Sequence, residues 1–174
     1  MTIIKELLRL LLNTLVAFAI GIFVVVFIGQ ITYITGHSME PTLQDRDVLI
    51  VDKVSYRFTA PSRFDVIAFP FSDQEHHIKR IIGLPGETVQ IIDGNIFING
   101  VFLIEDFGYE ETIHNPGIAS QPILLGEDEY FLLGDHRNRS RDSRDVHVGV
   151  RHRDEFVGRA WLRIWPLTGF GVVE

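Results

Sequence analysis

The chain of 174 residues contains no cysteine. This absence excludes disulfide bonds, thiol catalysis and cysteine-ligated zinc, and it leaves the redox compartment open because a cysteine-free fold works on either side of a membrane. Basic residues are also few, 16 against 23 acidic ones, for a formal net charge of −7. An acidic chain argues against a nucleic-acid partner, whose binding surface is basic. Seven histidines are present without a recognisable metal-ligand spacing, so the sequence predicts neither a metal site nor a cofactor.

Charge is absent from one long stretch near the N-terminus, LLLNTLVAFAIGIFVVVFI, which runs from Leu10 to Ile28. As a helix this stretch would be about 28 Å long, close to the roughly 30 Å of bilayer hydrocarbon. A removed signal peptide also has a positive start and an apolar run, but this run is longer than usual and no A-x-A-like site follows it. A buried core helix would show a polar face, which this one lacks. We therefore predict a retained transmembrane anchor over residues 10–30.

The charges that precede the apolar run set its orientation. Lys5 and Arg9 lie before it and would hold the N-terminus in the cytoplasm. A single span then predicts a cytoplasmic segment over residues 1–9 and an extracytoplasmic domain over residues 31–174, on the cell membrane. The length and a hydrophobic content of 46% suit one such domain.

The sequence after residue 40 consists of short alternating or β-branched apolar segments separated by turn residues. Asp93-Gly94 lies between two such segments and is a strong signal for a type I′ hairpin. No stretch there has convincing amphipathic helical spacing. We therefore predict a mainly β domain tethered by one helix. The predicted strands are Val48–Val51, Asp65–Phe69, His77–Ile82, Thr88–Ile92, Asn95–Ile98, Glu129–Leu133 and Gly158–Trp165.

The stretch GHSMEPTL, residues 36 to 43, places a serine close behind the predicted anchor. Ser38 lies ten residues past Ile28, and ten extended residues reach at most about 33–36 Å, so Ser38 acts near the membrane surface. Pro41 stiffens the stretch because proline fixes its own backbone and pushes the preceding residue toward an extended conformation. A serine hydroxyl is a weak nucleophile, and it needs a base to take its proton.

The stretch HIKRIIGLPGE, which begins at His77, offers such a base. Lysine can accept a proton when burial or cationic neighbours lower its pKa. In a strand Lys79 shares a face with His77 and Ile81, while Arg80 points to the opposite face. Of Lys79 and Arg80, one side chain can then be buried while the other is solvated or ion-paired. A third stretch, GDHRNRSRDSR over residues 134 to 144, gathers serines, aspartates and arginines in one loop.

Each of these three stretches has a plainer explanation when it is taken alone. A serine before Met-x-Pro-Thr is usually a turn residue, and a Lys-Arg pair in a strand is usually a solvated edge. A loop rich in arginine and aspartate is usually a salt-bridged surface loop. The functional interpretation therefore depends on their joint occurrence in one chain.

In this order, SMEPTL behind an apolar anchor, KRIIGLPGE and GDHRNRSRDSR closely resemble the sequence boxes of bacterial type I signal peptidases. The resemblance extends to Trp165-Pro166, nearly the whole chain. It implies a signal-peptidase-type antiparallel β catalytic domain with a small β insert, here reduced to residues 91–128. It also implies a membrane-anchored serine endopeptidase that removes N-terminal signal peptides from exported preproteins through an acyl-enzyme.

The resemblance assigns roles to individual residues. The serine of S-M-x-P-T, here Ser38, is the nucleophile, and the lysine of K-R-x-x-G-x-P-G, here Lys79, is the general base. In the third box the first of the two serines, Ser140, helps to orient the lysine. Asp142 and Arg144 form a supporting ion pair.

The resemblance also implies how the oxyanion of the reaction is held. Backbone N–H groups, including that of Ser38, are expected to bind it. Some relatives add a serine hydroxyl two positions earlier, where this chain has Gly36. The side-chain donor is therefore missing, and the backbone of Gly36 is a second candidate. Met39 and Pro41 are expected on the substrate-proximal and membrane-proximal side.

The implied partners are preprotein signal peptides and the lipid bilayer, with the secretion translocon as a further candidate. The chain departs from the family pattern at Arg46 and Phe64, where glycine is common, and at Asp145–His147 and Arg151–His152, where aromatic residues and Val-Pro are common. Because glycine often serves positions with positive φ, the first two departures concern loop shape. None of them removes a catalytic group.

Two other functions share part of this pattern. A self-cleaving protease of the SOS-repressor type shares the serine-lysine logic, but such chains carry a DNA-binding region instead of an apolar start. A non-catalytic, membrane-anchored β-domain that binds secretion partners would have no use for both Ser38 and Lys79. A serine-reactive acylating probe separates this last alternative from an enzyme.

Overall fold

The computed structural model describes residues 2–27, 29–70, 76–109 and 112–173. Within these ranges the chain forms one α-helix, twelve strands and five short 3-10 helices. The helix α1 spans Thr2–Phe27, and the strands are β1 (Gly29–Tyr33), β2 (Val48–Asp52), β3 (Val66–Pro70), β4 (His76–Gly83), β5 (Thr88–Ile92), β6 (Asn95–Ile98), β7 (Val101–Phe102), β8 (Ile123–Leu124), β9 (Glu129–Leu133), β10 (Arg151–His152), β11 (Gly158–Trp165) and β12 (Gly171–Val172). The 3-10 helices are Ser55–Arg57, Gly117–Ser120, Arg137–Arg139, Arg153–Glu155 and Leu167–Gly169.

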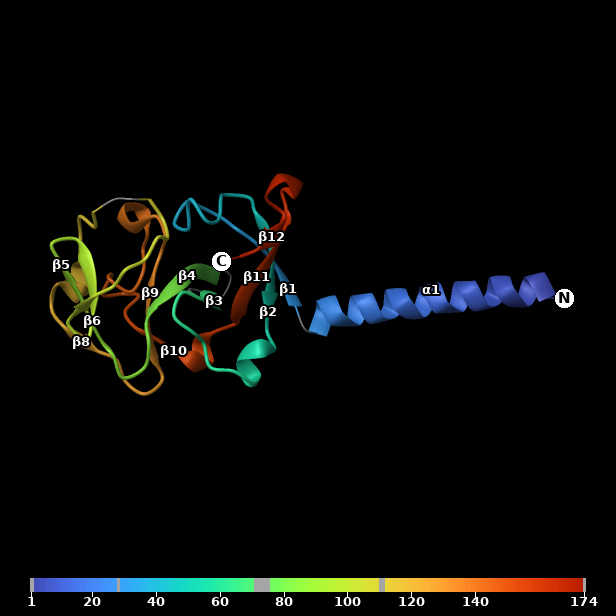
Figure 1. The fold of residues 1–174 in the computed structure, drawn as a ribbon, viewed down its shortest axis with the longest axis horizontal. Helices are drawn as coiled ribbons and strands as arrows, with labels where there is room; N and C mark the ends of the chain where they lie inside the picture. The colour runs from blue at the N-terminus through green and yellow to red at the C-terminus, as the bar shows by residue number, and fades with distance from the viewer. Residues whose placement is uncertain (1, 28, 71–75, 110–111, 174) are drawn as a thin grey trace.

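The strands form two antiparallel sheets. The larger sheet has the order β1-β2-β11-β3-β4-β9-β10, with β12 paired to β11, and the small sheet has the order β7-β6-β5-β8. Figure 1 shows α1 projecting from the end of the molecule that holds β1, β2 and β12, with the small sheet at the opposite end. The predicted mainly β, antiparallel fold is therefore confirmed.

The pairing of β3 with β4 fixes the two faces of the larger sheet around the predicted base. Ile67 pairs with Lys79, and Ala68 pairs with Ile78. Because successive side chains point to opposite faces, these two pairs belong to different faces. Ile67 packs in one hydrophobic cluster and Ala68 with Ile78 in another. Lys79 thus leaves a strand that is held on both faces by apolar packing.

The seven strands predicted from the sequence are all present, with ends that agree within one residue. Asp93 and Gly94 both have positive φ, 49° and 76°, as a type I′ hairpin requires. A second turn of the same kind, Asn99-Gly100 with φ of 52° and 78°, joins β6 to β7 and was not predicted. The short strands β7, β8, β10 and β12 were also not predicted.

The predicted anchor over residues 10–30 is wrong at its C-terminal boundary. The helix α1 ends at Phe27, and Gly29 and Gln30 already belong to β1, which pairs with β2; Ile28 lies outside the described residues. β-branched and aromatic residues in the sequence ITY favour this strand. In the part of the chain that the structure describes, no helix combines the length and hydrophobicity needed to cross a membrane. The structure therefore does not confirm a spanning anchor.

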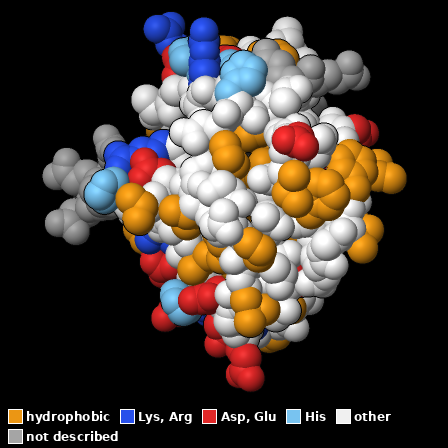
Figure 2. All heavy atoms as spheres, turned by 90° about the vertical axis from the view of Figure 1, so that its left-hand side faces the viewer, with side chains coloured by type: hydrophobic (Ala, Val, Ile, Leu, Met, Phe, Trp, Pro, Cys, Tyr) orange, Lys and Arg blue, Asp and Glu red, His pale blue; other side chains and the backbone are white. Residues whose placement is uncertain are grey.

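The predicted insert over residues 91–128 corresponds to the small sheet, whose strands run from Thr88 to Leu124 between β4 and β9. Val89 and Ile98, paired across β5 and β6, belong to its buried face. Figure 2 shows the end of the molecule opposite α1, where hydrophobic side chains reach the surface in several small patches with acidic side chains beside them. The small sheet shares one hydrophobic cluster with Ile82 of β4 and with Phe131 and Leu133 of β9, so it packs against the larger sheet.

Candidate active site

The nucleophile candidate Ser38 lies in a turn that is anchored by its apolar neighbours. Met39 and Leu43 are 2% and 1% exposed and pack in the hydrophobic cluster of the larger sheet. The N–H of Leu43 donates to the carbonyl of Met39 (2.9 Å), which closes one helical turn. The carbonyl of Ser38 accepts a hydrogen bond from the backbone N–H of His136 (3.1 Å). The hydroxyl of a partly exposed serine is thereby presented by a fixed backbone.

Gly36 precedes this turn with a φ of +93°, a conformation that side chains other than glycine rarely adopt. Its N–H donates to a carboxylate oxygen of Asp45 (2.8 Å). The described residues place no atom within 4 Å of the position that a Cβ on Gly36 would occupy. The N–H of Gly36 is therefore already bonded, while the space beside its Cα is open. Pro41 is exposed, and Met39 belongs to the core as well as to the wall of the groove described below.

Lys79 meets Ser38 directly. Its Nζ donates to Ser38 Oγ (2.7 Å) and to the carbonyl of Ile78 (2.9 Å), although the two residues are 41 positions apart in the sequence. Lys79 is 2% exposed. Burial lowers its pKa from 10.5 to about 8, against the smaller opposing effects of the carboxylates of Asp142 and Asp135. A lysine with this pKa is partly neutral near pH 8 and can then accept a proton.

The third sequence box folds around the ion pair between Asp142 and Arg144. Nε and Nη2 of Arg144 donate to the two carboxylate oxygens of Asp142, each at 2.8 Å, and both side chains are almost fully buried. Asp142 also accepts the N–H of Gly134 (3.1 Å). Such a bidentate pair holds a loop in one geometry. It fixes the two ends of the box, residues 134 and 144, to one another.

Ser140 lies inside the same box, next to the turn of Ser38. A Cβ added to Gly134 would collide with Ser140 Oγ and with the carbonyl oxygen of Ser38. Only glycine allows this approach. The hydroxyl of Ser140 is buried, and among the described residues it has no hydrogen-bond partner. Its predicted role in orienting Lys79 stays a prediction.

Arg80 and Asp135 form a second buried ion pair that sequence reasoning missed. Both side chains are fully buried, and Nε and Nη2 of Arg80 donate to the two oxygens of Asp135 at 2.8 and 2.7 Å. Arg80 also donates to the carbonyl of Phe64 (2.9 Å) and to Thr42 Oγ1 (3.3 Å). Its guanidinium carbon lies 3.7 Å from the ring centroid of Phe107. The sequence did place Arg80 on the strand face opposite Lys79. It left open whether the Arg80 side chain is solvated or paired.

A groove of about 280 Å³ opens beside the Ser38–Lys79 pair. His77 forms part of its wall, and burial, followed by the charges of Lys79, Arg141 and Arg151, lowers the pKa of His77 to about 4. His77 is therefore neutral at neutral pH. In the described part of the chain no three His, Asp or Glu side chains gather so as to hold a metal ion. The groove is lined by Tyr33, Ile34, Thr35, Gly36, His37, Ser38, Met39, His76, His77, Ile78, Lys79, Arg139 and Arg141.

Comparisons with known proteins show which family the chain belongs to. The family model described as "Signal peptidase, peptidase S26" matches residues 7–165. Probable signal peptidase I-2 of Synechocystis sp. is 38% identical over 167 residues, which cover 92% of this chain and 73% of that protein. Signal peptidase IB of Staphylococcus aureus is 29% identical over 180 residues, which cover 95% of this chain and 93% of that protein.

The chain is also similar to solved structures. A crystal structure of a signal peptidase I from Enterococcus faecalis V583 is 37% identical in sequence and has a TM-score of 0.48. The match covers 58% of this chain and 97% of that chain.

Proposed function

The chain belongs to the signal peptidase family, peptidase S26, and from this premise we propose that Ser38 and Lys79 are the nucleophile and the general base with which it acts. It is a serine endopeptidase of the signal peptidase I type, and it cleaves signal peptides from preproteins. The observation that carries the proposal is the 2.7 Å contact between Nζ of a buried lysine and Oγ of a partly exposed serine. This family assignment disfavours the SOS-repressor type of protease and the non-catalytic β-domain.

The proposed reaction has two proton transfers in each half. Ser38 Oγ attacks the scissile carbonyl carbon while neutral Lys79 takes the hydroxyl proton. The ammonium then gives this proton to the leaving amine, the C–N bond breaks, and an ester joins the signal peptide to Ser38. In the second half Lys79 takes a proton from water, the hydroxide attacks the ester, and Ser38 regains its proton as the acid leaves.

The oxyanion of each tetrahedral intermediate needs donors that are already in place. We assign the first donor to the backbone N–H of Ser38, because the bond from His136 to the Ser38 carbonyl fixes the adjoining peptide. The N–H of Gly36 is the second candidate, and it would have to release Asp45 in order to serve. The open space beside Gly36 leaves room for the substrate carbonyl there.

In this proposal Asp142, Arg144 and Ser140 support catalysis by fixing the conformation of the third sequence box. The Asp142–Arg144 pair holds Gly134, which in turn lies against Ser38 and Ser140. The buried hydroxyl of Ser140 is the group we assign to orient Lys79 when the amine turns toward the substrate. β9 pairs with β4 only from Arg80 onward. This leaves the first half of β4, beside the groove, as an edge along which a signal peptide can lie extended.

We assign a membrane location to this chain. In this proposal α1 anchors the domain through its apolar residues 10–27, residues 1–9 are cytoplasmic, and the β domain is extracytoplasmic. Described apolar side chains of α1 such as Leu12 and Phe18 are exposed, 60% and 69%. Exposed aromatic side chains at the same end of the molecule would lie at the bilayer surface. These include Tyr33, Trp165 and Phe170. The secretion translocon stays a candidate partner.

The test is cleavage of a purified preprotein in detergent by three variants. Ser38→Ala and Lys79→Ala are each expected to lower kcat/KM by about 10³-fold or more, because the two groups act as a unit. Lys53→Ala is the matched control, since Lys53 is exposed and does not line the groove. Near-normal turnover by either of the first two variants, with the fold retained by circular dichroism, would overturn the assignment.

A further inference from the structure

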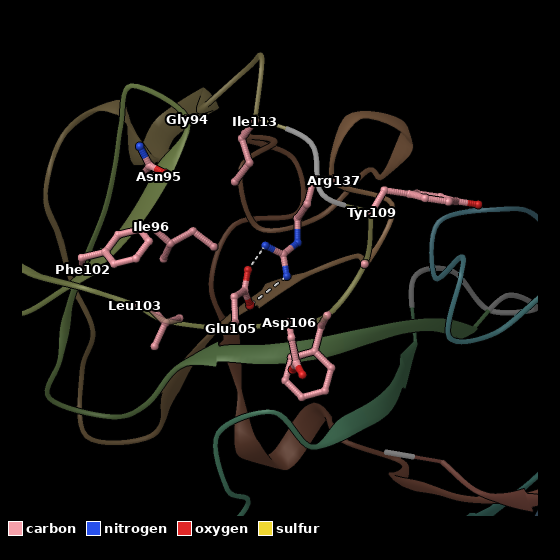
Figure 3. Close-up of a pocket in the computed structure, with 12 residues that line it drawn as sticks. Gly94, Asn95, Ile96, Phe102, Leu103, Glu105, Asp106, Tyr109, Ile113 and Arg137 are labelled. Atoms are coloured by element: carbon pink, nitrogen blue, oxygen red, sulfur yellow. Dashed lines mark hydrogen bonds and ion pairs between the residues drawn. The ribbon is translucent and has the colours of Figure 1, made fainter.

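A segment that follows the small sheet runs alongside the third sequence box. Residues 105–109, here called the strap, come after β7 and lie against Asp135–Arg137, directly after β9. Figure 3 shows Glu105 and Arg137 in direct contact, and both line a cavity of about 360 Å³ between the strap and the small sheet. Both Nη atoms of Arg137 donate to the carboxylate of Glu105, and Nε donates to the carbonyl of Gly134 (3.1 Å). The first residue of the strap is thus ion-paired to the box.

The middle of the strap meets the residue before His136. Gly108 has a φ of +89°, and a Cβ at this position would collide with the carbonyl oxygen of Asp135. The neighbouring ring of Phe107 packs under the guanidinium of Arg80 at 3.7 Å. Arg80 is the partner of Asp135. A buried cation over an aromatic ring is a favourable contact, so the strap holds Asp135 from two directions.

The last residue of the strap contacts His136 itself. The ring of Tyr109 meets the imidazole edge-on, with centroids 4.9 Å apart and an interplanar angle of 66°. Figure 3 shows the Tyr109 side chain pointing away from the cavity. The His136 side chain is 12% exposed, and the tyrosine ring is one of the groups that pack on it. Tyr109 is therefore placed to limit where His136 can move.

His136 in turn contacts the turn of Ser38 twice. Its backbone N–H donates to the carbonyl of Ser38 (3.1 Å), and its Nδ1 lies 3.7 Å from a carboxylate oxygen of Glu40. The other oxygen of Glu40 is hydrogen-bonded to Nδ1 of His37 at 2.8 Å. The Glu40 carboxylate thus lies between two imidazoles, one before the nucleophile and one in the third box. A displacement of His136 would therefore shift the turn at both Ser38 and Glu40.

We propose that Tyr109 and His136 are positioning residues for Ser38, and that the strap is the element through which the small sheet braces the nucleophile. The proposal rests on the proposed function in that Ser38 is taken as the nucleophile. Neither residue belongs to the groove lining, so neither is expected to contact the peptide. A displacement of about 1 Å in a reacting group can cost about 10²-fold in rate. The strap therefore acts on the chemical step and leaves substrate binding unchanged.

The first experiment removes the ring that seats His136. Tyr109→Leu is expected to lower kcat for preprotein cleavage about 10- to 100-fold while KM stays within about twofold, because the bound peptide keeps its contacts but Oγ is misplaced. Tyr109→Phe keeps the ring and should restore most of the rate. Phe102→Leu is the matched control, because Phe102 lines the same cavity and is exposed, yet packs on Phe97 of the small sheet. Its rate should equal that of the wild type.

The second experiment tests the other member of the pair with a readout that needs no preprotein. His136→Leu should slow labelling of Ser38 by a serine-reactive acylating probe, followed by intact mass, to the same extent as it lowers kcat. His136→Asn, which keeps a polar group near the place of Nδ1, should label faster than His136→Leu. Equal kcat and equal labelling rates for the wild type, Tyr109→Leu and His136→Leu would overturn the proposal.

The wild type and Ser38→Ala separate failure of this inference from failure of the proposed function. If the wild type cleaves and Ser38→Ala does not, the proposed function stands, and the strap variants alone decide this proposal. If the variants lose activity only in proportion to a lower melting temperature, or raise KM as much as they lower kcat, the positioning role is wrong. A wild-type protein that neither cleaves nor labels at Ser38 would overturn both.

Discussion

Burial makes Lys79 usable as a base. A lysine in water is almost fully protonated at neutral pH, but Lys79 is 2% exposed and its pKa falls from 10.5 to about 8. Two carboxylates nearby, Asp135 and Asp142, favour the charged form. Each of them is paired with its own arginine, Arg80 or Arg144. The arginines limit the attraction that the carboxylates exert on the ammonium, so desolvation dominates.

This balance predicts a pH dependence for cleavage. The logarithm of kcat/KM should rise with pH and level off above about pH 8, because only the neutral amine of Lys79 accepts the proton. Initial rates on a short peptide at subsaturating concentration, over about pH 6 to 10, measure this profile for the free enzyme. A profile without any inflection in that range would argue against Lys79 as the base.

The lowered pKa of Lys79 also affects how the free energy of unfolding depends on pH. A salt-bridged lysine, whose pKa is raised, has the opposite effect. The unfolded chain, with a lysine pKa of 10.5, binds more protons than the native state between about pH 8 and 10.5. The contribution of Lys79 to the free energy of unfolding therefore rises with pH across this window. Below it both states carry the charge, and the native state bears the cost of burying an ammonium group.

The residues of the site differ in how far the sequence predicts them. Ser38 and Lys79 were predicted from chemistry and family resemblance, and the structure brings their reactive atoms together. Asp142 and Arg144 form the predicted ion pair within one loop. The pairing of Arg80 with a residue 55 positions away depends on β4 lying beside β9. No local pattern in a sequence contains this information.

At the scale of elements, all strands of four residues or more except β1 were predicted, because their apolar residues alternate or are β-branched. The two-residue strands β7, β8, β10 and β12 are too short to show any period. The strand β1 was missed for a different reason. Gly29 and Gln30 follow the apolar run, and neither residue clearly marks the end of a helix. The strand forms because these residues pair with β2. Tertiary pairing here determines a boundary that local propensity does not.

Two loops carry side chains in a backbone conformation that suits glycine. Arg46 and Phe64 have φ of 72° and 73°, at the two positions where the sequence departs from the glycines common in the family. The chain tolerates Phe64 because its ring packs on Phe107 with centroids 4.9 Å apart. The Arg46 side chain is 93% exposed, and its contact with Asp45 is a loose surface pair of 3.6 Å. Little in the structure compensates the strain at Arg46.

We therefore expect Arg46→Gly to stabilise the protein. Relief of the left-handed conformation should raise the free energy of unfolding by about 1 kcal/mol, since this conformation costs about 1–2 kcal/mol outside glycine. Thermal unfolding in detergent, monitored by circular dichroism, measures the change. The control is Arg57→Gly, an exposed arginine in a 3-10 helix without positive φ, which should lower stability by about 0.5–1 kcal/mol. A lower melting temperature for Arg46→Gly would contradict the strain argument.

At the scale of the whole molecule, the helix α1 and the small sheet lie at opposite ends, and the groove beside Ser38 follows directly after β1. Figure 1 shows α1 extending from one end along the long axis, whereas the small sheet and the strap lie toward the other end. The groove next to Ser38 is lined in part by residues 33–39, directly after β1. If α1 holds the domain at a bilayer, the groove stays within a short distance of the membrane surface. A substrate anchored in the same bilayer would then be presented to it at high local concentration.

Removal of α1 tests this arrangement. A chain that begins at Gly29 keeps all the strands and their pairing, so it should fold. Cleavage of a short water-soluble peptide should stay within about threefold of the full chain, whereas cleavage of a preprotein in lipid vesicles should fall about tenfold or more with the loss of local concentration. The two rates, measured side by side for both chains, give the ratio. An equal loss on both substrates would show that α1 supports the fold and not the encounter.

The contacts of Arg80 carry one more consequence, which concerns the timing of activity during folding. Its guanidinium contacts Thr42, Phe64, Phe107 and Asp135, four segments that are distant in the sequence. These segments converge only when the chain around Arg80 has folded, and contacts between residues so far apart in the sequence are slow to form. Before that point Lys79 is an ordinary solvated lysine and Ser38 an inert alcohol. We therefore expect the Ser38–Lys79 pair to stay inactive until the segments around Arg80 have folded, so that the assembly of the fold itself controls when the chain can cleave a peptide bond.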